Sequence, residues 1–158
     1  VAQPFVEWLI HVFILHQRPR EIAGRTVDLH AAKHHRAHHL DPWDLRFTVM
    51  PLPAAAFGLG STTALAVWLL PLGPALTLVA ITWFLAALYE WTHFLIHTSY
   101  RPRTLIYKRL WKLHRLHHFK NETLWFGVTR TLGDRVLGTT ADPSTVPKSP
   151  TAKTLHAQ

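Results

Sequence analysis

The sequence of 158 residues contains no cysteine. This absence excludes disulfide bonds, iron–sulfur clusters and thiolate metal ligands, and it leaves imidazole and carboxylate groups to hold any metal. Charged residues are also scarce, at 16% of the chain against about 25% in an average soluble domain. The scarcity is uneven, because Glu90 is the one charged residue between Phe47 and His97 and all 17 Lys and Arg lie outside that stretch.

The stretch with almost no charge is long enough for two membrane-spanning helices. Residues 47–70 and 74–97 are apolar, and Pro71-Leu72-Gly73 predicts a turn between them. Each segment would be about 36 Å long as a helix, enough to cross a hydrocarbon core of about 30 Å. A buried helical hairpin of a soluble protein is the alternative, but uncharged runs of this length are typical of membrane spans.

A hairpin returns the chain to the side from which it started, so the segments before and after it share one face of the membrane. That face carries every Lys and Arg, and the positive-inside rule therefore predicts that it is cytoplasmic. The formal net charge of +8 then indicates orientation and contact with phospholipid rather than nucleic-acid binding. We expect a multi-pass protein of the plasma membrane in a bacterium or of the endoplasmic reticulum in a eukaryote. Residues 1–16 look like the end of another apolar helix, and we expect its hairpin partner to precede Val1.

Histidine is abundant outside the apolar segments, and ten of the 13 histidines fall into two nearly repeated sets. Each set opens with Glu-Trp, continues with a spaced pair and ends in the run H-R-x-H-H. The ten are His11, His16, His35, His38, His39, His93, His97, His114, His117 and His118. Neutral imidazole is the commonest side-chain metal ligand. Ten imidazoles in this grouping are too many for one ion and about right for two.

The spacing of these histidines has a geometric meaning, because residues three and four apart share a helix face. The last three histidines of each set therefore point in one direction, and so do His93 and His97. His11 and His16 are five apart, which separates them by about 140° on a regular helix. They can meet only where the helix ends or bulges, and residues 17–20, Gln-Arg-Pro-Arg, favour a helix end.

Two further helices and a tail complete the predicted organisation. Residues 29–39 are expected to form a helix that stops at Asp41-Pro42, and residues 103–120 a basic helix with an apolar stripe. Residues 139–158 are rich in Thr, Ser and Pro. We therefore expect one unit over residues 1–138, followed by a polar C-terminal tail that is mobile or wrapped on the surface.

The order H-x4-H, H-x2-H-H, H-x3-H, H-x2-H-H resembles the fatty acid hydroxylase and sterol desaturase superfamily of membrane di-iron oxygenases. The segment from Phe126 to Thr139 is similar to the one that follows the last histidine box in that family, although Gly133 stands where many members carry Trp. The resemblance extends from about Glu7 to Thr139. It implies an all-α fold in which a membrane-embedded helical hairpin meets a cytoplasmic helical cap that carries a di-metal site.

The resemblance also implies an activity. Members insert oxygen into, or desaturate, unactivated C–H bonds of lipids with O2, and side chains alone cannot supply that chemistry. We therefore expect a lipid hydroxylase in which the ten histidines hold two iron ions, for which zinc can substitute because it binds such sites more tightly. No cytochrome b5-like domain accompanies the motifs, so a separate electron-transfer protein is expected. The acyl chain or other long lipid should enter from the membrane between the helices that carry His11 and His93.

Polar residues near the histidine boxes are candidates to orient the ligand imidazoles through their other ring nitrogen. They are Glu7, Asp41, Asp44, Glu90, Asn121 and Glu122. Asn121 is also a candidate to bind a metal-bound water. His30 and His34 are extra to the family pattern and are expected to face solvent or support the ligands, while His156 in the tail is expected to have no role.

Other functions remain open at this point. A lipid desaturase would need the same ligands, and carotenoid-ring hydroxylases have similar boxes, although their first two boxes are usually closer together than His16 and His35. A non-catalytic metal-binding or transport protein is the alternative of another class. A transporter should place its ligands near the bilayer midplane, whereas the histidines of this sequence gather at one face.

Overall fold

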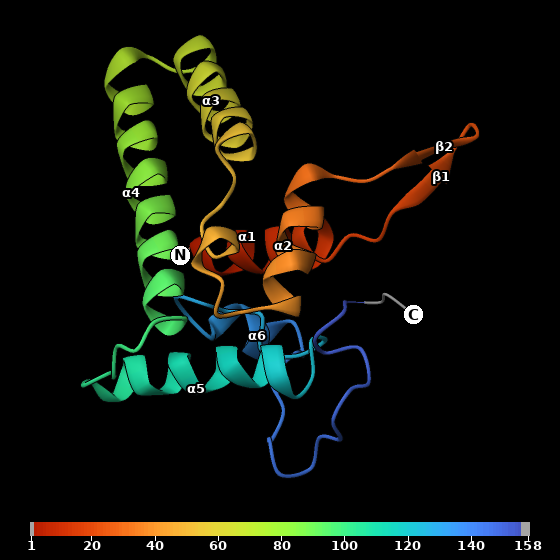
Figure 1. Ribbon diagram of the computed structural model, residues 1–158. Helices are drawn as coiled ribbons and strands as arrows, with labels where there is room; N and C mark the ends of the chain where they lie inside the picture. The colour runs from red at the N-terminus through yellow and green to blue at the C-terminus, as the bar shows by residue number, and fades with distance from the viewer. Residues whose placement is uncertain (1, 156–158) are drawn as a thin grey trace.

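The computed structural model describes residues 2–155 and is mostly helical (Figure 1). In chain order the elements are α1 (Gln3–Ile10), the π-helical turn η1 (His11–Leu15), β1 (Arg20–Ile22), β2 (Arg25–Val27), α2 (His30–Leu40), the 3-10 turn η2 (Leu45–Phe47), α3 (Leu52–Leu69), α4 (Leu72–Ile96), α5 (Leu105–Phe119) and α6 (Leu132–Val136). Helices α3 and α4 project as a hairpin, and α1, α2, α5 and α6 gather around the lower end of α4 as a cap (Figure 1).

The hairpin has the properties expected of a membrane anchor. Its two candidate spans, Leu45–Leu69 and Leu72–Ile96, are 25 residues each, and 6% of the most apolar window of each is buried. The side chains of a buried hairpin in a soluble protein would be covered by protein, and those of these two helices are not. Helix α4 begins at Leu72, slightly before the predicted start at Pro74. Pro74 lies in the first turn, where its missing N–H costs no helical hydrogen bond.

The bulge expected between His11 and His16 is present. The turn η1 is π-helical, and the His16 N–H donates to the His11 carbonyl at 3.0 Å instead of to the residue four before it. A π turn adds a residue to the helical turn, so residues five apart fall on the same side. The two imidazole rings consequently lie 4.9 Å apart between centroids. The helix ends directly afterwards, as the residues that follow predicted.

The helices that carry the H-R-x-H-H runs are confirmed with small shifts in their ends. Helix α2 spans His30–Leu40, and Asp41 caps it before Pro42. Helix α5 spans Leu105–Phe119, and the Thr104 hydroxyl accepts the Tyr107 N–H at 3.2 Å at its N-terminus. Both helices end one residue after the final histidine pair, so that pair lies in the last turn of each helix.

A short β-hairpin, which the sequence did not predict, is added to the helical body. Strands β1 and β2 pair antiparallel with Arg20 opposite Val27. The turn between them places Ala23 and Gly24 at positive φ, 51° and 73°. Such a turn usually contains Asn-Gly or Asp-Gly, and this sequence has Ala-Gly instead. The strands are exposed along their whole length and project away from the cap (Figure 1).

The interior of the cap consists largely of histidine. Nine of the ten ligand candidates are buried, and six of them are among the largest fully buried side chains of the described chain. The described part of the tail covers this interior, because Ala152 and Leu155 are 2% exposed and the Ser149 N–H donates to the Lys120 carbonyl at 2.7 Å. Of the two expectations for the tail, wrapping on the surface is the one observed. His156 lies outside the described residues.

Candidate metal centre

The ten histidines form two separate groups of five. Cluster 1 consists of His11, His16, His35, His39 and His117, and cluster 2 consists of His38, His93, His97, His114 and His118. Each residue offers one ring nitrogen, and within a cluster these nitrogens all lie within 4.8 Å of one another. No carboxylate belongs to either group. The described part of the chain thus offers two all-imidazole metal sites.

The clusters do not coincide with the two repeated sets of the sequence. Cluster 1 takes His117 from the second set, and cluster 2 takes His38 from the first. These two occupy the same place in the two H-R-x-H-H runs, so the exchange is symmetric. Consecutive residues of a helix point about 100° apart, and so the adjacent pair His38-His39 of α2 serves two different clusters, as His117-His118 of α5 does.

The spacing of the ring nitrogens fits metal coordination. In cluster 1 the Nε2 atoms of His11 and His35 are 3.1 Å apart, and those of His16 and His117 are 3.2 Å apart. In cluster 2 the three corresponding contacts measure 3.0–3.1 Å. Metal–nitrogen bonds of about 2.1 Å place two ligands at right angles about 3.0 Å apart. Neutral imidazoles that converge in this way direct their nitrogen lone pairs toward one point, and a cation at that point would bind them.

Backbone carbonyls hold the outer nitrogens of four ligand imidazoles. The Nδ1–H groups of His11, His39, His93 and His117 donate to the carbonyls of Phe126 (2.7 Å), Ala152 (3.0 Å), Thr48 (2.9 Å) and Leu124 (2.7 Å), respectively. A donated Nδ1–H fixes the tautomer and leaves Nε2 free to bind metal. These carbonyl groups were not predicted, because any residue type supplies one.

Comparison with known proteins identifies the family of this fold and site. The family model described as "Fatty acid hydroxylase" matches residues 1–139. This chain belongs to the fatty acid hydroxylase family. The dihydroceramide fatty acyl 2-hydroxylase FAH2 of Arabidopsis thaliana is 29% identical over 145 residues, covering 85% of this chain and 55% of the relative. The ceramide very long chain fatty acid hydroxylase SCS7 of Saccharomyces cerevisiae is 36% identical over 109 residues, covering 69% of this chain and 28% of that protein.

A solved structure gives the same answer at the level of the fold. Full-length Scs7p, of which only the hydroxylase domain is visible, superposes with a TM-score of 0.76 at 30% identity, covering 94% of this chain and 55% of that one. The chain thus spans about half the length of the Arabidopsis relative and of this structure. The chain thus combines three features: membership of the fatty acid hydroxylase family, an apolar hairpin typical of membrane proteins, and histidine clusters that can hold metal.

In this family member Glu7 supports cluster 1 indirectly. It is 6% exposed, and its carboxylate accepts the N–H groups of Val128 and Thr129, the Thr129 hydroxyl and the Gln3 amide. These bonds fix the loop whose Phe126 carbonyl holds His11. Glu7 therefore binds the loop behind His11 and does not contact an imidazole, and its role in orienting that ligand stays a prediction.

Glu90 and Glu122 are placed in the same way. Glu90 accepts the Met50 N–H at 3.0 Å, two residues after the Thr48 carbonyl that holds His93. Glu122 accepts the hydroxyls of Ser149 and Thr151 at 3.0 and 2.5 Å, which fixes the tail beside the Ala152 carbonyl that holds His39. Asn121 accepts the N–H and hydroxyl of Thr123 at 3.0 and 2.7 Å. That turn precedes Leu124, whose carbonyl holds His117.

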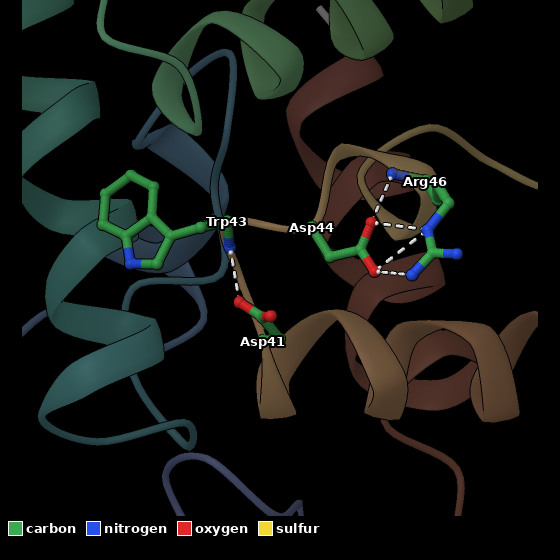
Figure 2. A network of polar contacts seen from close by, with 4 residues as sticks. All are labelled: Asp41, Trp43, Asp44 and Arg46. Atoms are coloured by element: carbon green, nitrogen blue, oxygen red, sulfur yellow. Dashed lines mark hydrogen bonds and ion pairs between the residues drawn. The ribbon is translucent and has the colours of Figure 1, made fainter.

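Asp41 and Asp44 are not brought to the imidazoles. Asp41 accepts the Trp43 N–H at 3.2 Å, and Asp44 accepts the N–H and guanidinium of Arg46 (Figure 2). Both carboxylates therefore shape the connection between α2 and α3. His30 and His34 also lie outside the two clusters.

Asp134 of α6 is a further buried carboxylate beside cluster 1, and it was not among the predicted site residues. It is 1% exposed, and its carboxylate accepts the N–H groups of Phe126 and Gly127, each at 2.8 Å. Gly127 is required there, because a Cβ would lie 2.1 Å from the Arg130 carbonyl oxygen. Helix α6 reaches the loop because Gly133 lets it approach α1 closely, where a Cβ would lie 2.5 Å from the Pro4 carbonyl. Asp134 and Glu7 thus bind neighbouring N–H groups of the loop whose Phe126 carbonyl contacts His11.

Burial keeps the ligand imidazoles neutral. It lowers the pKa of His39 to about 3, and together with the nearby His93 and Arg115 it lowers the pKa of His97 to about 2. Burial also lowers the pKa of His117 well below its ordinary value. A neutral imidazole is the form that binds metal. The histidines are therefore already in the metal-binding form near neutral pH and need not release protons when a metal binds.

A small cavity lies against both clusters at the membrane side of the cap. Its volume is about 30 Å³, and His35 of cluster 1 and His93 of cluster 2 contribute to its wall. Leu15, Met50 and Tyr89 add apolar groups from the cap and from the lower end of α4, and Glu90 also lines the cavity. The cavity has room for about one water molecule, and substrate entry between the helices that carry His11 and His93 stays a prediction.

Proposed function

We propose that this chain is the metal-binding and membrane-anchoring part of an oxygenase that hydroxylates the acyl chain of a membrane lipid next to the acyl carbonyl. Two iron ions, O2 and electrons from an external electron-transfer protein would complete the reaction. The observation that carries the proposal is the pair of five-histidine clusters buried at the end of an apolar hairpin. The family relatives named as fatty acyl 2-hydroxylases supply the position on the chain.

The bound iron ions would supply the oxygen-inserting redox chemistry that side chains cannot perform. The residues of this chain provide the conditions for it. The ten histidines would hold the ions, the carbonyls of Thr48, Leu124, Phe126 and Ala152 fix four of the rings, and the packed tail excludes water from the clusters. Imidazole ligands add no negative charge, so two cations would retain their full charge in the interior.

The position of the clusters suits a lipid substrate. His93 lies in the last turn of α4, and His97 follows its final residue, Ile96. Both ligands are therefore at the level where the hairpin leaves the membrane. An acyl chain would reach the cap without crossing water. A transporter should instead hold its ligands near the middle of the bilayer.

The orientation is also part of the proposal. Every Lys and Arg lies outside the 47–97 stretch, which supports a cytoplasmic cap and a multi-pass arrangement. A cytoplasmic cap would be accessible to a soluble or membrane-bound electron donor.

Lipid analysis tests the function. Cells expressing the chain should contain acyl lipids with a mass gain of one oxygen, located next to the acyl carbonyl by fragmentation. Cells expressing His117→Ala at equal level should lack them, because cluster 1 would have lost one of its five ligands. A metal-binding protein without catalysis would give two metals per chain and the same lipid profile for both proteins, and that outcome would refute the proposal.

A further inference from the structure

An open groove of about 570 Å³ lies beside cluster 2, away from the small cavity. Three aromatic side chains, two arginines and one metal ligand form most of its wall. They are Trp43, Trp111, Tyr100, Arg101, Arg115 and His97. The groove therefore reaches a metal ligand and is rich in hydrogen-bond donors.

Arg115 is the best-placed cation in this groove. Its guanidinium lies 4.7 Å from the ring centroid of Trp43 and 4.3 Å from that of Trp111. The ring of Trp43 points away from the Asp44–Arg46 pair (Figure 2) and lies 6.3 Å from the His97 ring. The two tryptophans hold the guanidinium by cation–π contact, and they place it one aromatic ring away from cluster 2.

Comparison with Arg36 shows that Arg115 is not neutralised. Arg36 occupies the equivalent place in the first H-R-x-H-H run, and it pairs with Asp28 at 2.5 Å and donates to the Gln17 carbonyl at 3.0 Å. Arg115 has no carboxylate within 4.0 Å among residues 2–155. The indole N–H of Trp111 also has no acceptor within the described chain. An arginine retains its charge even when partly buried, so the groove presents a guanidinium that lacks a carboxylate partner.

The groove lies just beyond the end of the candidate span α4, where lipid headgroups are expected. Thr98, Ser99 and Tyr100 line it directly after the end of α4. Tryptophan and tyrosine are enriched at this level of a membrane, where one side of the ring is apolar and the other is wet. A lipid in the adjacent leaflet would have its polar end next to the groove.

Chemistry next to an acyl carbonyl places a strict demand on the site. The carbonyl carbon is bonded to the carbon that reacts, so the carbonyl oxygen must lie within a few ångströms of the metal cluster when the reaction occurs. We infer that this groove binds the acyl carbonyl end of the substrate, with Arg115 donating to the carbonyl oxygen. The inference rests on the proposed function for the position of oxidation. The acceptor would be the carboxylate of a free fatty acid or the amide carbonyl of a ceramide.

Equilibrium binding tests this inference without any turnover. Metal-loaded protein in lipid nanodiscs, with no reductant, would be titrated with radiolabelled palmitic acid and, separately, with a palmitoyl dihydroceramide. Arg115→Gln should raise the Kd of at least one ligand by about ten- to a hundredfold, the range for a hydrogen bond to a charged group. Arg115→Lys, which keeps the charge, should recover most of the loss. Arg109→Gln removes the same charge from an exposed position of α5 and should leave both Kd values unchanged.

The two ligands separate the two sources of the carbonyl. A larger loss with palmitic acid assigns the carboxylate, and an equal or larger loss with the dihydroceramide assigns the amide; both support the inference. Unchanged Kd values in Arg115→Gln, or no binding of either ligand to the wild-type protein, would overturn it. If Arg115→Gln bound less metal, its Kd would be compared with that of Arg115→Lys at equal metal content.

Turnover then separates this inference from the proposed function. With electrons supplied, Arg115→Gln should raise KM and leave kcat within about threefold, because binding at the polar end adds equally to ground and transition states. A fall in kcat at constant KM would assign Arg115 a purely structural role between its tryptophans. Wild-type protein that binds the ligands but never hydroxylates them would refute the proposed function and leave the binding site established.

Discussion

Replacement of Glu7 by Gln should weaken metal binding at cluster 1 without removing a ligand. The Glu7 carboxylate accepts hydrogen bonds from Val128, Thr129 and Gln3. Glutamine has the same shape, but it offers one oxygen and turns an N–H2 group toward donors. At least one buried donor therefore loses its acceptor, and the loop that places the Phe126 carbonyl against His11 loosens.

Glu7→Gln should lower both the free energy of unfolding and the metal affinity of cluster 1. A buried donor left without an acceptor costs about 1–3 kcal/mol, which should appear in the free energy of unfolding. Loss of a group that orients a metal ligand reduces metal affinity by about ten- to a hundredfold. Because Glu7 reaches only the loop that holds His11, the loss should fall on one of the two metals. Cluster 2 should keep the affinity of the wild-type protein.

Competition with a chelator of known affinity measures this directly. The wild-type protein should release two metals at similar chelator concentrations, whereas Glu7→Gln should release one of them at a concentration about ten- to a hundredfold lower. Glu21→Gln is the matched control, because Glu21 is an exposed carboxylate of β1 far from the loop. If Glu7→Gln and Glu21→Gln released both metals together with the wild-type protein, support of cluster 1 through the loop would be disproved.

Three further outcomes are expected. His38→Ala should remove metal from cluster 2, although His38 belongs to the first histidine set. Elemental analysis of the double variant His16→Ala/His38→Ala should show metal lost from both clusters. Retention of one full metal would refute the exchange of ligands between the sets. The metal-free protein should lose stability as pH falls below about 6.5, because burial lowers the pKa of His39 to about 3 and that of His97 to about 2. The unfolded chain then binds protons that the folded chain does not, which amounts to a loss of ~4 kcal/mol from these two groups between pH 7 and 5. Equal denaturation midpoints at pH 7 and 5 would contradict this. Single cysteines at Leu72 and Thr123, in a chain without native cysteine, should show label from an impermeant thiol reagent in intact cells at position 72, and label at position 123 would reverse the proposed orientation.

Local spacing was sufficient to predict which histidines gather into clusters and the helices that carry them. The runs around His35 and His114 put three imidazoles at the end of a helix, and the five-residue gap after His11 required the bulge that η1 supplies. The uncharged stretch predicted α3 and α4 because transfer of charge into lipid is unfavourable over the whole length of a span.

Other features depend on tertiary packing and could not be predicted in the same way. The exchange of His38 and His117 between clusters follows from how α2 and α5 face each other, which their separate sequences do not encode. The backbone carbonyls that accept from the imidazoles cannot be predicted from residue type, because every residue has one. Asp134 could have been selected, since it stands in the segment that resembles the family and a buried carboxylate is rarely without a purpose.

The central claim is that two metals held by ten histidines insert oxygen next to an acyl carbonyl, and one measurement tests it most directly. Protein loaded anaerobically with iron would be given a palmitoyl lipid deuterated at both hydrogens of the carbon next to the carbonyl, a reductant and O2 enriched in oxygen-18. The account predicts a product that carries one atom of oxygen-18 and retains one deuterium on that carbon. Iron-loaded protein that yields no product, or a product with unlabelled oxygen or both deuterium atoms retained, would contradict it.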